Sequence, residues 1–372
     1  MLKELRILIK PVSSACNLRC RYCFYRDESG RREMEDYGRM SRETAKVLVE
    51  RALGGAQTCT FSFQGGEPTL AGLSFFEEFV QMVEERQREG QEVFYSIQTN
   101  GWNLDERWIA FFRRKGFLVG ISLDGVRNTH DRNRLDKAGR GTFEQVFHSV
   151  KKMQEAGVPL NVLCVLNRQT GERVDAVYRF FMRKGLRYQQ YIPCLDPLEG
   201  PRGREEYSLS PGLYGKALKK LFDLWFEDRR RGVPVYIRQF DNYLKMLDRG
   251  QPESCGMYGR CTMQNVIEAD GRVYPCDFYV LDSYEMGNIR DTDFESLQDR
   301  AWTEERGSFF ENSSRRDDRC KDCRWYPLCR GGCRRDCLSE NGENRNYYCE
   351  AYREFFPYVI ERMEWMVARG MV

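Results

Sequence analysis

Cysteine is the feature that most constrains this chain, because fifteen cysteines stand beside only two histidines in 372 residues. Small secreted domains use many cysteines as disulfides, but this chain is large and an odd number cannot pair completely. Residues 1–10 lack the long apolar core and small-residue cleavage site of a signal peptide. Thiolate metal ligands are therefore expected. The scarcity of histidine favours all-cysteine sites, with iron–sulfur as their leading form.

Composition excludes several other classes of protein. Lys and Arg number 59 against 56 Asp and Glu, so the net charge is only +3, and 41% of the residues are hydrophobic. This is the composition of a globular protein, and it provides no global attraction for nucleic acid or a membrane surface. No apolar run approaches the roughly 20 residues that a transmembrane helix needs. We expect a cytoplasmic protein with neither nucleic acid nor membrane as a partner.

The first ~195 residues alternate between short β-rich runs and amphipathic stretches. The predicted strands are Leu5–Ile9, Cys59–Phe63, Val93–Gln98, Phe117–Leu123, Leu160–Leu166 and Tyr188–Pro193. The predicted helices lie near Ser41–Leu53, Phe75–Glu89, Glu106–Lys115, Phe143–Ala156 and Glu172–Lys184. Such βα repeats predict an α/β fold with a parallel sheet. The pattern alone is compatible with a doubly wound sheet or a partial barrel.

Polar and glycine-rich residues follow most of these strands, which favours the barrel. These segments are Cys16–Cys20, Gln64–Pro68, Thr99–Gly101, Asp124–Gly125 and Cys194–Pro197. α/β folds place their functional sites at the carboxyl ends of parallel strands. A site is therefore expected where these five segments meet.

The repeat ends in a charged helical bridge that includes Tyr214–Arg230, and most of the remaining cysteines follow it. We therefore predict two domains. Residues 1–235 would form the α/β domain with its bridging helix, and residues 236–372 would form a cysteine-rich domain.

Cys16, Cys20 and Cys23 form a C-x3-C-x2-C loop, and Tyr22 precedes its third cysteine. Three thiolates are one short of a closed tetrahedral site, which suits a metal centre that must bind a further ligand. A zinc loop with a distant fourth ligand is the alternative. The spacing resembles the signature of the radical S-adenosylmethionine (radical SAM) enzymes. The resemblance implies a partial (β/α)6 barrel and a [4Fe-4S] cluster whose open iron binds S-adenosylmethionine.

The same resemblance implies further contacts to S-adenosylmethionine. The positions that match the family are Tyr22, Gly65, Gly66, Glu67, Ser122, Arg134 and Leu195. Gly65, Gly66 and Glu67 match a motif whose backbone meets the amino group of the methionine moiety, and Arg134 is suited to its carboxylate. A plain turn, a strand hydroxyl and a core leucine are the alternatives for the glycine pair, Ser122 and Leu195.

The later cysteines resemble the SPASM extension of peptide-modifying radical SAM enzymes, which carries two auxiliary [4Fe-4S] clusters. The resemblance assigns the first cluster to Cys255, Cys261, Cys276 and Cys333, and the second to Cys320, Cys323, Cys329 and Cys349. Three [4Fe-4S] clusters would then account for eleven cysteines. A zinc ribbon is the alternative for Cys320–Cys333. Cys59 and Cys164 are expected to be small buried hydrophobes, Cys194 is expected near the site, and Cys337 competes with Cys333 as a ligand.

Asp277 follows one of these cysteines directly, and a carboxylate there is suited to accept a proton, although an ordinary turn aspartate is the alternative. The segments around it, with Phe63–Gly72 and Gln98–Gly101, resemble the anaerobic sulfatase-maturating enzymes. That family implies oxidation of cysteine or serine in a Cys/Ser-x-Pro-x-Arg motif of a sulfatase to Cα-formylglycine. Asp277 would be the base, and Tyr25 and Gln64 would line the peptide pocket.

The resemblance also implies a flavodoxin- or ferredoxin-like electron donor. Two other classes of function remain open at this stage. One is a SPASM maturase that forms thioether or carbon–carbon crosslinks in a ribosomal peptide, and the other is a non-enzymatic zinc or electron-carrier protein.

Overall fold

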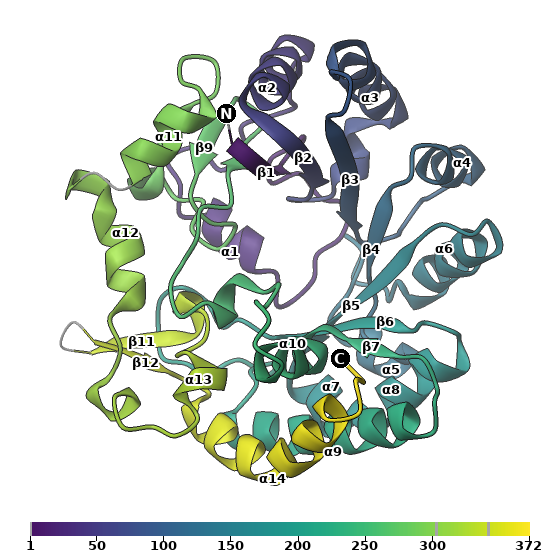
Figure 1. The fold of residues 1–372 in the computed structure, drawn as a ribbon. Coiled ribbons are helices and arrows are strands. Elements are labelled where there is room, and N and C mark those ends of the chain that lie inside the picture. Colours follow the sequence, from purple (N-terminus) through teal and green to yellow (C-terminus); the bar gives the residue numbers. More distant parts are fainter. Residues whose placement is uncertain (1, 302–303, 341–342) are drawn as a thin grey trace. The chain divides into compact units, whose positions relative to one another are not determined.

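The computed structural model describes residues 2–301, 304–340 and 343–372. Figure 1 shows the helices and strands in chain order by colour. The chain divides by its packing into two compact units, each discontinuous in sequence. The first unit comprises Met1–Ser122, Arg134–Leu160 and Thr262–Gly307, and the second comprises Leu123–Asn133, Asn161–Cys261 and Ser308–Val372. The predicted division at residue 235 follows sequence rather than packing, and it stays a prediction. No described helix is long and apolar enough to cross a bilayer.

A seven-strand portion of the sheet organises the first unit, with β1 near its centre. In spatial order the strands are β10 (Gly287–Asn288), β9 (Arg272–Tyr274), β8 (Val266–Ile267), β1 (Leu2–Ile9), β2 (Ala56–Phe63), β3 (Glu92–Thr99) and β4 (Leu118–Ser122). β8 and β1 to β4 run parallel, and β9 is antiparallel to both of its neighbours, β8 and β10. Ile9 lies opposite Phe63 on one side and Ile267 on the other, so the loops after β1, β2 and β8 emerge together.

The helices of the first unit follow its strands, as predicted. They are α1 (Phe24–Ser29), α2 (Arg42–Gly55), α3 (Leu73–Arg86), α4 (Glu106–Arg114), α6 (Phe143–Glu155) and α11 (Phe294–Ala301). Ser41 begins α2 by accepting a hydrogen bond from the Thr44 N–H at 3.0 Å. The Thr142 hydroxyl makes no such cap at α6 and instead donates to the Arg134 carbonyl at 3.0 Å.

The second unit carries β5 (Leu160–Leu166), whose first residue belongs to the first unit, with β6 (Tyr188–Pro193) and β7 (Tyr236–Ile237) parallel to it in turn. β11 (Cys337–Glu340) and β12 (Glu343–Asn346) form an antiparallel pair. The helices of the second unit are α5 (Arg127–His130), α7 (Arg168–Glu172), α8 (Val174–Arg183), α9 (Pro211–Arg230), α10 (Arg238–Leu247), α13 (Tyr326–Cys329) and α14 (Cys349–Val367). α12 (Glu304–Ser314) crosses the boundary between the units. The aromatic residues of α14 pack on α9, with the Phe222 and Phe355 ring centroids 6.0 Å apart.

All fifteen cysteines lie in the described part of the chain, and none of them forms a disulfide. Cys59 and Cys164 are fully buried, which confirms their interpretation as small hydrophobic side chains, and Cys194 is buried as well.

Candidate active site

The loop after β1 carries the first cysteine motif and is bound to the turn after β2 by backbone hydrogen bonds. Gln64 N–H donates to the Ile9 carbonyl at 2.9 Å, which continues the pairing of β1 with β2 past Phe63. Gly66 N–H donates to the Ser13 carbonyl at 2.9 Å, and Glu67 N–H donates to the Ala15 carbonyl at 2.8 Å. The glycine turn therefore fixes the chain immediately before Cys16.

Glycine is required at this turn because the two backbones are in contact. A Cβ atom on Gly66 would lie 2.0 Å from the Ala15 carbonyl oxygen, which is far inside van der Waals contact. Gly65 has a φ of 126°, a conformation that residues with a side chain rarely adopt. The sequence pattern predicts that these glycines admit a ligand, and the structure adds that the cysteine loop itself lies against them.

The Glu67 carboxylate is 1% exposed and is occupied by four donors. They are the hydroxyls of Thr69 and Thr99, at 2.6 and 2.7 Å, and the N–H groups of Thr69 and Asn100, at 3.1 and 2.8 Å. Burial raises the pKa of this carboxyl, while the donors lower it. Its side chain thus ties the β2 turn to the Thr99–Gly101 turn, and its predicted contact with the cofactor stays a prediction.

The Asn100 side chain approaches the first cysteine motif in the first unit. Asn100 Nδ2 lies 3.9 Å from Cys16 Sγ and 2.8 Å from Asn17 Oδ1, and Leu18 N–H donates to Cys16 Sγ at 3.4 Å. Burial raises the pKa of the Cys16 thiol to about 12, with a further contribution from Glu67. Loading a metal cluster here must therefore displace a proton from Cys16.

Arg134 reaches the same region although its loop is distant in sequence. Its guanidinium carbon lies 5.4 Å from the centre of the Tyr22 ring, and Arg19 N–H donates to the Leu135 carbonyl at 2.7 Å. Tyr22 and Arg134 are each 7% exposed. The structure thus brings two of the predicted cofactor-binding residues together beside the cysteine loop.

Asp277 lies in the first unit and is bound through both carboxylate oxygens. Lys10 Nζ donates to Oδ1 and Gln64 Nε2 donates to Oδ2, each at 2.6 Å. The Lys10 side chain is fully buried, and 10% of the Asp277 side chain is exposed. Asp277 N–H donates to Gln264 Oε1 at 3.0 Å, which fixes the backbone after Cys276. A carboxylate in this setting is oriented and partly accessible, as a proton acceptor should be.

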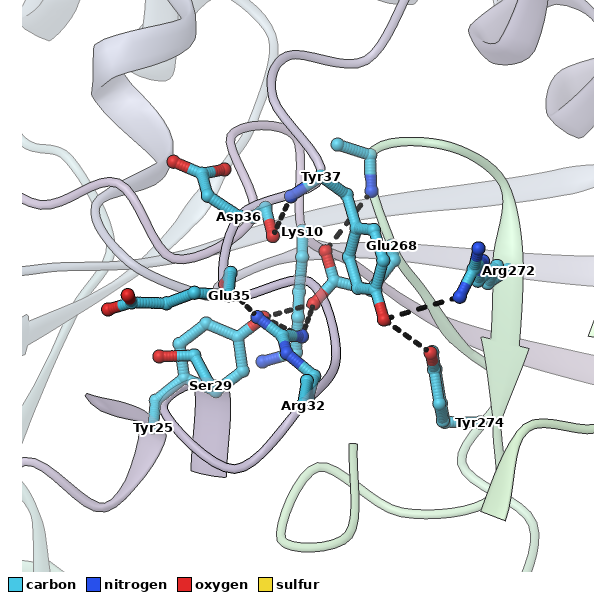
Figure 2. A network of polar contacts seen from close by, with 12 residues as sticks. Lys10, Tyr25, Ser29, Arg32, Glu35, Asp36, Tyr37, Glu268, Arg272 and Tyr274 are labelled. Carbon is cyan, nitrogen blue, oxygen red and sulfur yellow. Dashed lines mark hydrogen bonds and ion pairs between the residues drawn. The ribbon is translucent and has the colours of Figure 1, made fainter. Parts of the chain in front are cut away.

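A second buried ion pair joins Arg32 to Glu268 (Figure 2). Arg32 donates to Glu268 at 2.8 Å, and both side chains are 0% exposed. Tyr25 is 3% exposed, and its hydroxyl donates to Glu268. The Lys10 ammonium lies 3.6 Å from the centre of the Tyr25 ring. Tyr25 was predicted to line the peptide pocket, which stays a prediction; its hydroxyl is engaged in this network.

Sequence reasoning did not single out Lys10, Arg32 or Glu268 as functional side chains. The available signal was a charged residue directly after an apolar strand run, at Lys10 after β1 and at Glu268 after Val266–Ile267. Such a residue is more often exposed, so the pattern alone did not identify a buried pair.

The cysteines of the second unit form two groups. Cys320, Cys323, Cys329 and Cys349 are close enough that burial and their mutual charges raise the pKa of Cys329 to about 12. Cys255 and Cys261 act in the same way on Cys333, whose pKa burial raises well above its usual value. Cys337 lies near Cys261, and its thiol is directed at the Cys333 carbonyl at 3.3 Å. Iron–sulfur ligation by these cysteines stays a prediction. Among the described residues, no three His, Cys, Asp or Glu side chains are arranged to hold a single metal ion.

The remaining predicted site residues are distributed over both units. Ser122 is half-buried at the end of β4, and Cys276 is 8% exposed in the first unit. Leu195 is half-buried after β6 in the second unit, which also holds Cys255, Cys261 and Cys333. The joint roles assigned to these residues across the two units stay predictions.

Residues 11–181 match the Radical SAM superfamily, and residues 255–324 match an iron-sulfur cluster-binding domain, SPASM. Together with the cysteine loop, the βα repeats and the glycine cradle, as we call the Gly65–Gly66 turn against that loop, these matches define a radical SAM protein with a SPASM extension. They confirm the predicted fold class, a partial (β/α)6 barrel followed by a cysteine-rich domain. The SPASM match also disfavours the zinc ribbon, since that domain binds iron–sulfur clusters.

A cysteine-type anaerobic sulfatase-maturating enzyme of Clostridium novyi (strain NT) is 45% identical over 368 residues, which is 98% of each chain. A serine-type relative from Bacteroides thetaiotaomicron is 29% identical and covers 98% of this chain and 91% of its own. The structure of native anSMEcpe with bound AdoMet and Cp18Cys peptide superposes with a TM-score of 0.93 at 42% identity, over 98% of this chain and 99% of that one. The chain belongs to the anaerobic sulfatase-maturating enzymes.

Gly66→Ala tests the glycine cradle. Because its methyl group would overlap the Ala15 carbonyl, we expect the cysteine loop to be displaced and S-adenosylmethionine binding to weaken by at least about tenfold. Iron content and equilibrium binding of S-adenosylmethionine to the reconstituted protein measure this effect. Gly54→Ala is the matched control, since a Cβ there meets nothing within 4 Å. Equal binding by both variants would contradict the role of the cradle.

Proposed function

We propose that this chain oxidises a cysteine side chain in a sulfatase polypeptide to Cα-formylglycine. The single observation that carries the proposal is the Asp277 carboxylate, bound by Lys10 and Gln64 in the unit that holds the first cysteine motif. Family membership supports the reaction, and this geometry supports Asp277 as the base that the reaction needs. Relatives with a bound peptide support a polypeptide substrate for this chain.

The residues present fit the cofactors that this chemistry requires. Cys16, Cys20 and Cys23 would hold a [4Fe-4S] cluster, with the Gly65–Glu67 backbone, Tyr22, Ser122, Arg134 and Leu195 about S-adenosylmethionine. The eight further cysteines would hold two auxiliary clusters, which makes three in all. When bound, the first cluster and S-adenosylmethionine supply a 5′-deoxyadenosyl radical for hydrogen abstraction from the substrate Cβ.

Asp277 has a proton to accept in this reaction. After hydrogen abstraction from Cβ, the substrate would lose its thiol proton and a second electron, which the auxiliary clusters would accept, so that carbon and sulfur become doubly bonded. Water would then replace the sulfur, which leaves as sulfide, to give the aldehyde. Each of its carboxylate oxygens accepts one donor from the protein and keeps a lone pair for a substrate. The adjacent ammonium of Lys10 balances its charge in a site with little water. Gln64 fixes the plane of the carboxylate and so the direction of the free lone pairs.

Cysteine is proposed as the preferred target, because identity to the cysteine-type relatives is 44–45% and identity to the serine-type relatives is 29–30%. The electron partner is proposed to be a flavodoxin- or ferredoxin-like carrier. A reducing cytoplasm is the proposed location, because it keeps the cysteine ligands reduced.

The reaction itself is tested first with two peptides that differ only at the target, Cys-x-Pro-x-Arg and Ser-x-Pro-x-Arg. Reconstituted protein, reductant and S-adenosylmethionine are combined with each peptide under anaerobic conditions, and products are measured by mass spectrometry. We expect the aldehyde and 5′-deoxyadenosine, with faster turnover of the cysteine peptide. Deoxyadenosine formed without any change in either peptide would assign the chain to another substrate.

Asp277→Asn tests the base. The amide keeps the shape of the side chain but accepts no proton from the substrate, so we expect formylglycine formation to fall at least about 100-fold. Iron content and S-adenosylmethionine binding serve as the internal controls, and both are expected to match the wild type. Undiminished turnover would remove Asp277 from the mechanism.

Cys320→Ala tests the number of clusters. Three clusters predict about twelve iron atoms per chain, and loss of one ligand set is expected to remove about four of them. Cys337→Ala is the matched control, because Cys337 is not among the proposed ligands although it lies in the same cysteine-rich segment. Iron and sulfide analysis of the anaerobically reconstituted variants gives the answer. Equal iron loss in the two variants would overturn this ligand assignment.

A further inference from the structure

Lys10 pairs with Asp277 and not with Glu268, the buried carboxylate that follows the neighbouring strand. Lys10 follows β1 directly, and Glu268 follows β8, the parallel neighbour of β1. Lys10 N–H donates to the Ile267 carbonyl at 2.8 Å, so the two residues leave their strands side by side. The Lys10 ammonium nevertheless pairs with Asp277.

Three other donors bind the Glu268 carboxylate. Arg32 donates to its Oε1 at 2.8 Å, the Tyr25 hydroxyl donates to the same oxygen, and Ala269 N–H donates to Oε2 at 3.2 Å. Arg32 is held in turn by the Glu35 carbonyl, at 2.6 Å from Nη2. Figure 2 shows these groups converging on Glu268 around the Lys10 stem.

Tyr25 links the two ion pairs. Its hydroxyl donates to Glu268, and the face of its ring receives the Lys10 ammonium at 3.6 Å. A phenol that donates to a carboxylate has a more electron-rich ring, which strengthens attraction of a cation to the ring face. Glu268 therefore acts on Lys10 through this ring rather than by direct pairing.

Four buried charges are thereby matched in two pairs, Arg32 with Glu268 and Lys10 with Asp277. A buried ion pair rarely adds net stability over an apolar pair of equal volume, so stability alone does not account for Arg32 and Glu268. The arrangement does account for the direction of Lys10, because Arg32 already neutralises Glu268, the carboxylate that follows the neighbouring strand.

From this geometry we infer that Arg32 and Glu268, acting through Tyr25, are positioning residues that direct Lys10 onto Asp277. The inference rests on the proposed function, in which Asp277 is the base. Loss of the Arg32 charge would free Glu268 to draw Lys10 away from Asp277. Loss of the Glu268 charge would weaken the attraction of the Tyr25 ring for the Lys10 ammonium. In either variant the Asp277 carboxylate would lose its orientation toward the substrate. Radical formation would continue, because the cysteine loop and glycine cradle are untouched, but fewer radicals would yield product.

The test is the ratio of formylglycine peptide to 5′-deoxyadenosine in the reconstituted holoenzyme with the cysteine peptide. Glu268→Gln and Arg32→Gln are expected to lower this ratio about tenfold, the scale of one charge-assisted hydrogen bond, with iron content and peptide KM unchanged. Arg32→Lys, which keeps the charge, is expected to restore most of the ratio.

Tyr37→Phe is the control for a change beside the Arg32 guanidinium that leaves both charges in place. The Tyr37 ring centre lies 4.8 Å from the Arg32 guanidinium carbon, but its hydroxyl contacts Tyr274, Asp282 and Arg272 rather than Glu268. We expect its ratio to equal that of the wild type. In an Asp277→Asn background, Glu268→Gln is expected to cause no further loss, because both changes act through the same carboxylate.

A crystal structure of Arg32→Gln provides a readout that does not depend on turnover. Lys10 Nζ is expected within hydrogen-bond distance of Glu268 and no longer of Asp277. If Lys10 remains on Asp277, or if the ratio is unchanged in both charge variants, the inference is overturned. Wild-type protein that makes deoxyadenosine but no formylglycine would instead refute the proposed function, and the position of Lys10 in Arg32→Gln would still decide the inference.

Discussion

The pairing of β1 with β2 on one side and β8 on the other is the constraint on which the first unit depends. β1 carries the cysteine loop and Lys10 at its carboxyl end, β2 carries the glycine turn, and β8 carries Glu268. Because all three strands are parallel and in register, residues from three distant parts of the chain emerge at one edge. A slip of one residue would direct each of these side chains to the opposite face of the sheet.

Backbone contact, more than side-chain contact, fixes the cysteine loop on this edge. The N–H groups of Gly66 and Glu67 are both directed at carbonyls that precede Cys16, and no side chain fits between the two chains. Glu67 then links the glycine turn to the next strand through its buried carboxylate. A reactive radical demands such rigidity, since small displacements of the reacting atoms lower the rate strongly.

Of the three buried carboxylates Glu67, Glu268 and Asp277, Asp277 is the most accessible. Glu67 is enclosed by four donors, and Glu268 is fully buried with its arginine, whereas Asp277 keeps a partly exposed side chain and free lone pairs. These three buried acids are therefore chemically different although each follows or lies near a strand end. The differences come from their partners: hydroxyl and amide donors for Glu67, a guanidinium for Glu268, and an ammonium with an amide for Asp277.

The sequence by itself determined the βα repeats, the cysteine motifs and the candidate base, because each depends on local spacing or on residue types with few alternative uses. The spacing of Cys16, Cys20 and Cys23 is carried by a single loop, and Asp277 is adjacent to Cys276. Only the tertiary structure decided which buried charges meet, because Lys10 and Asp277 are 267 residues apart and Arg32 and Glu268 are 236 apart. Such pairings depend on strand register and loop course, which leave no local periodicity in the sequence.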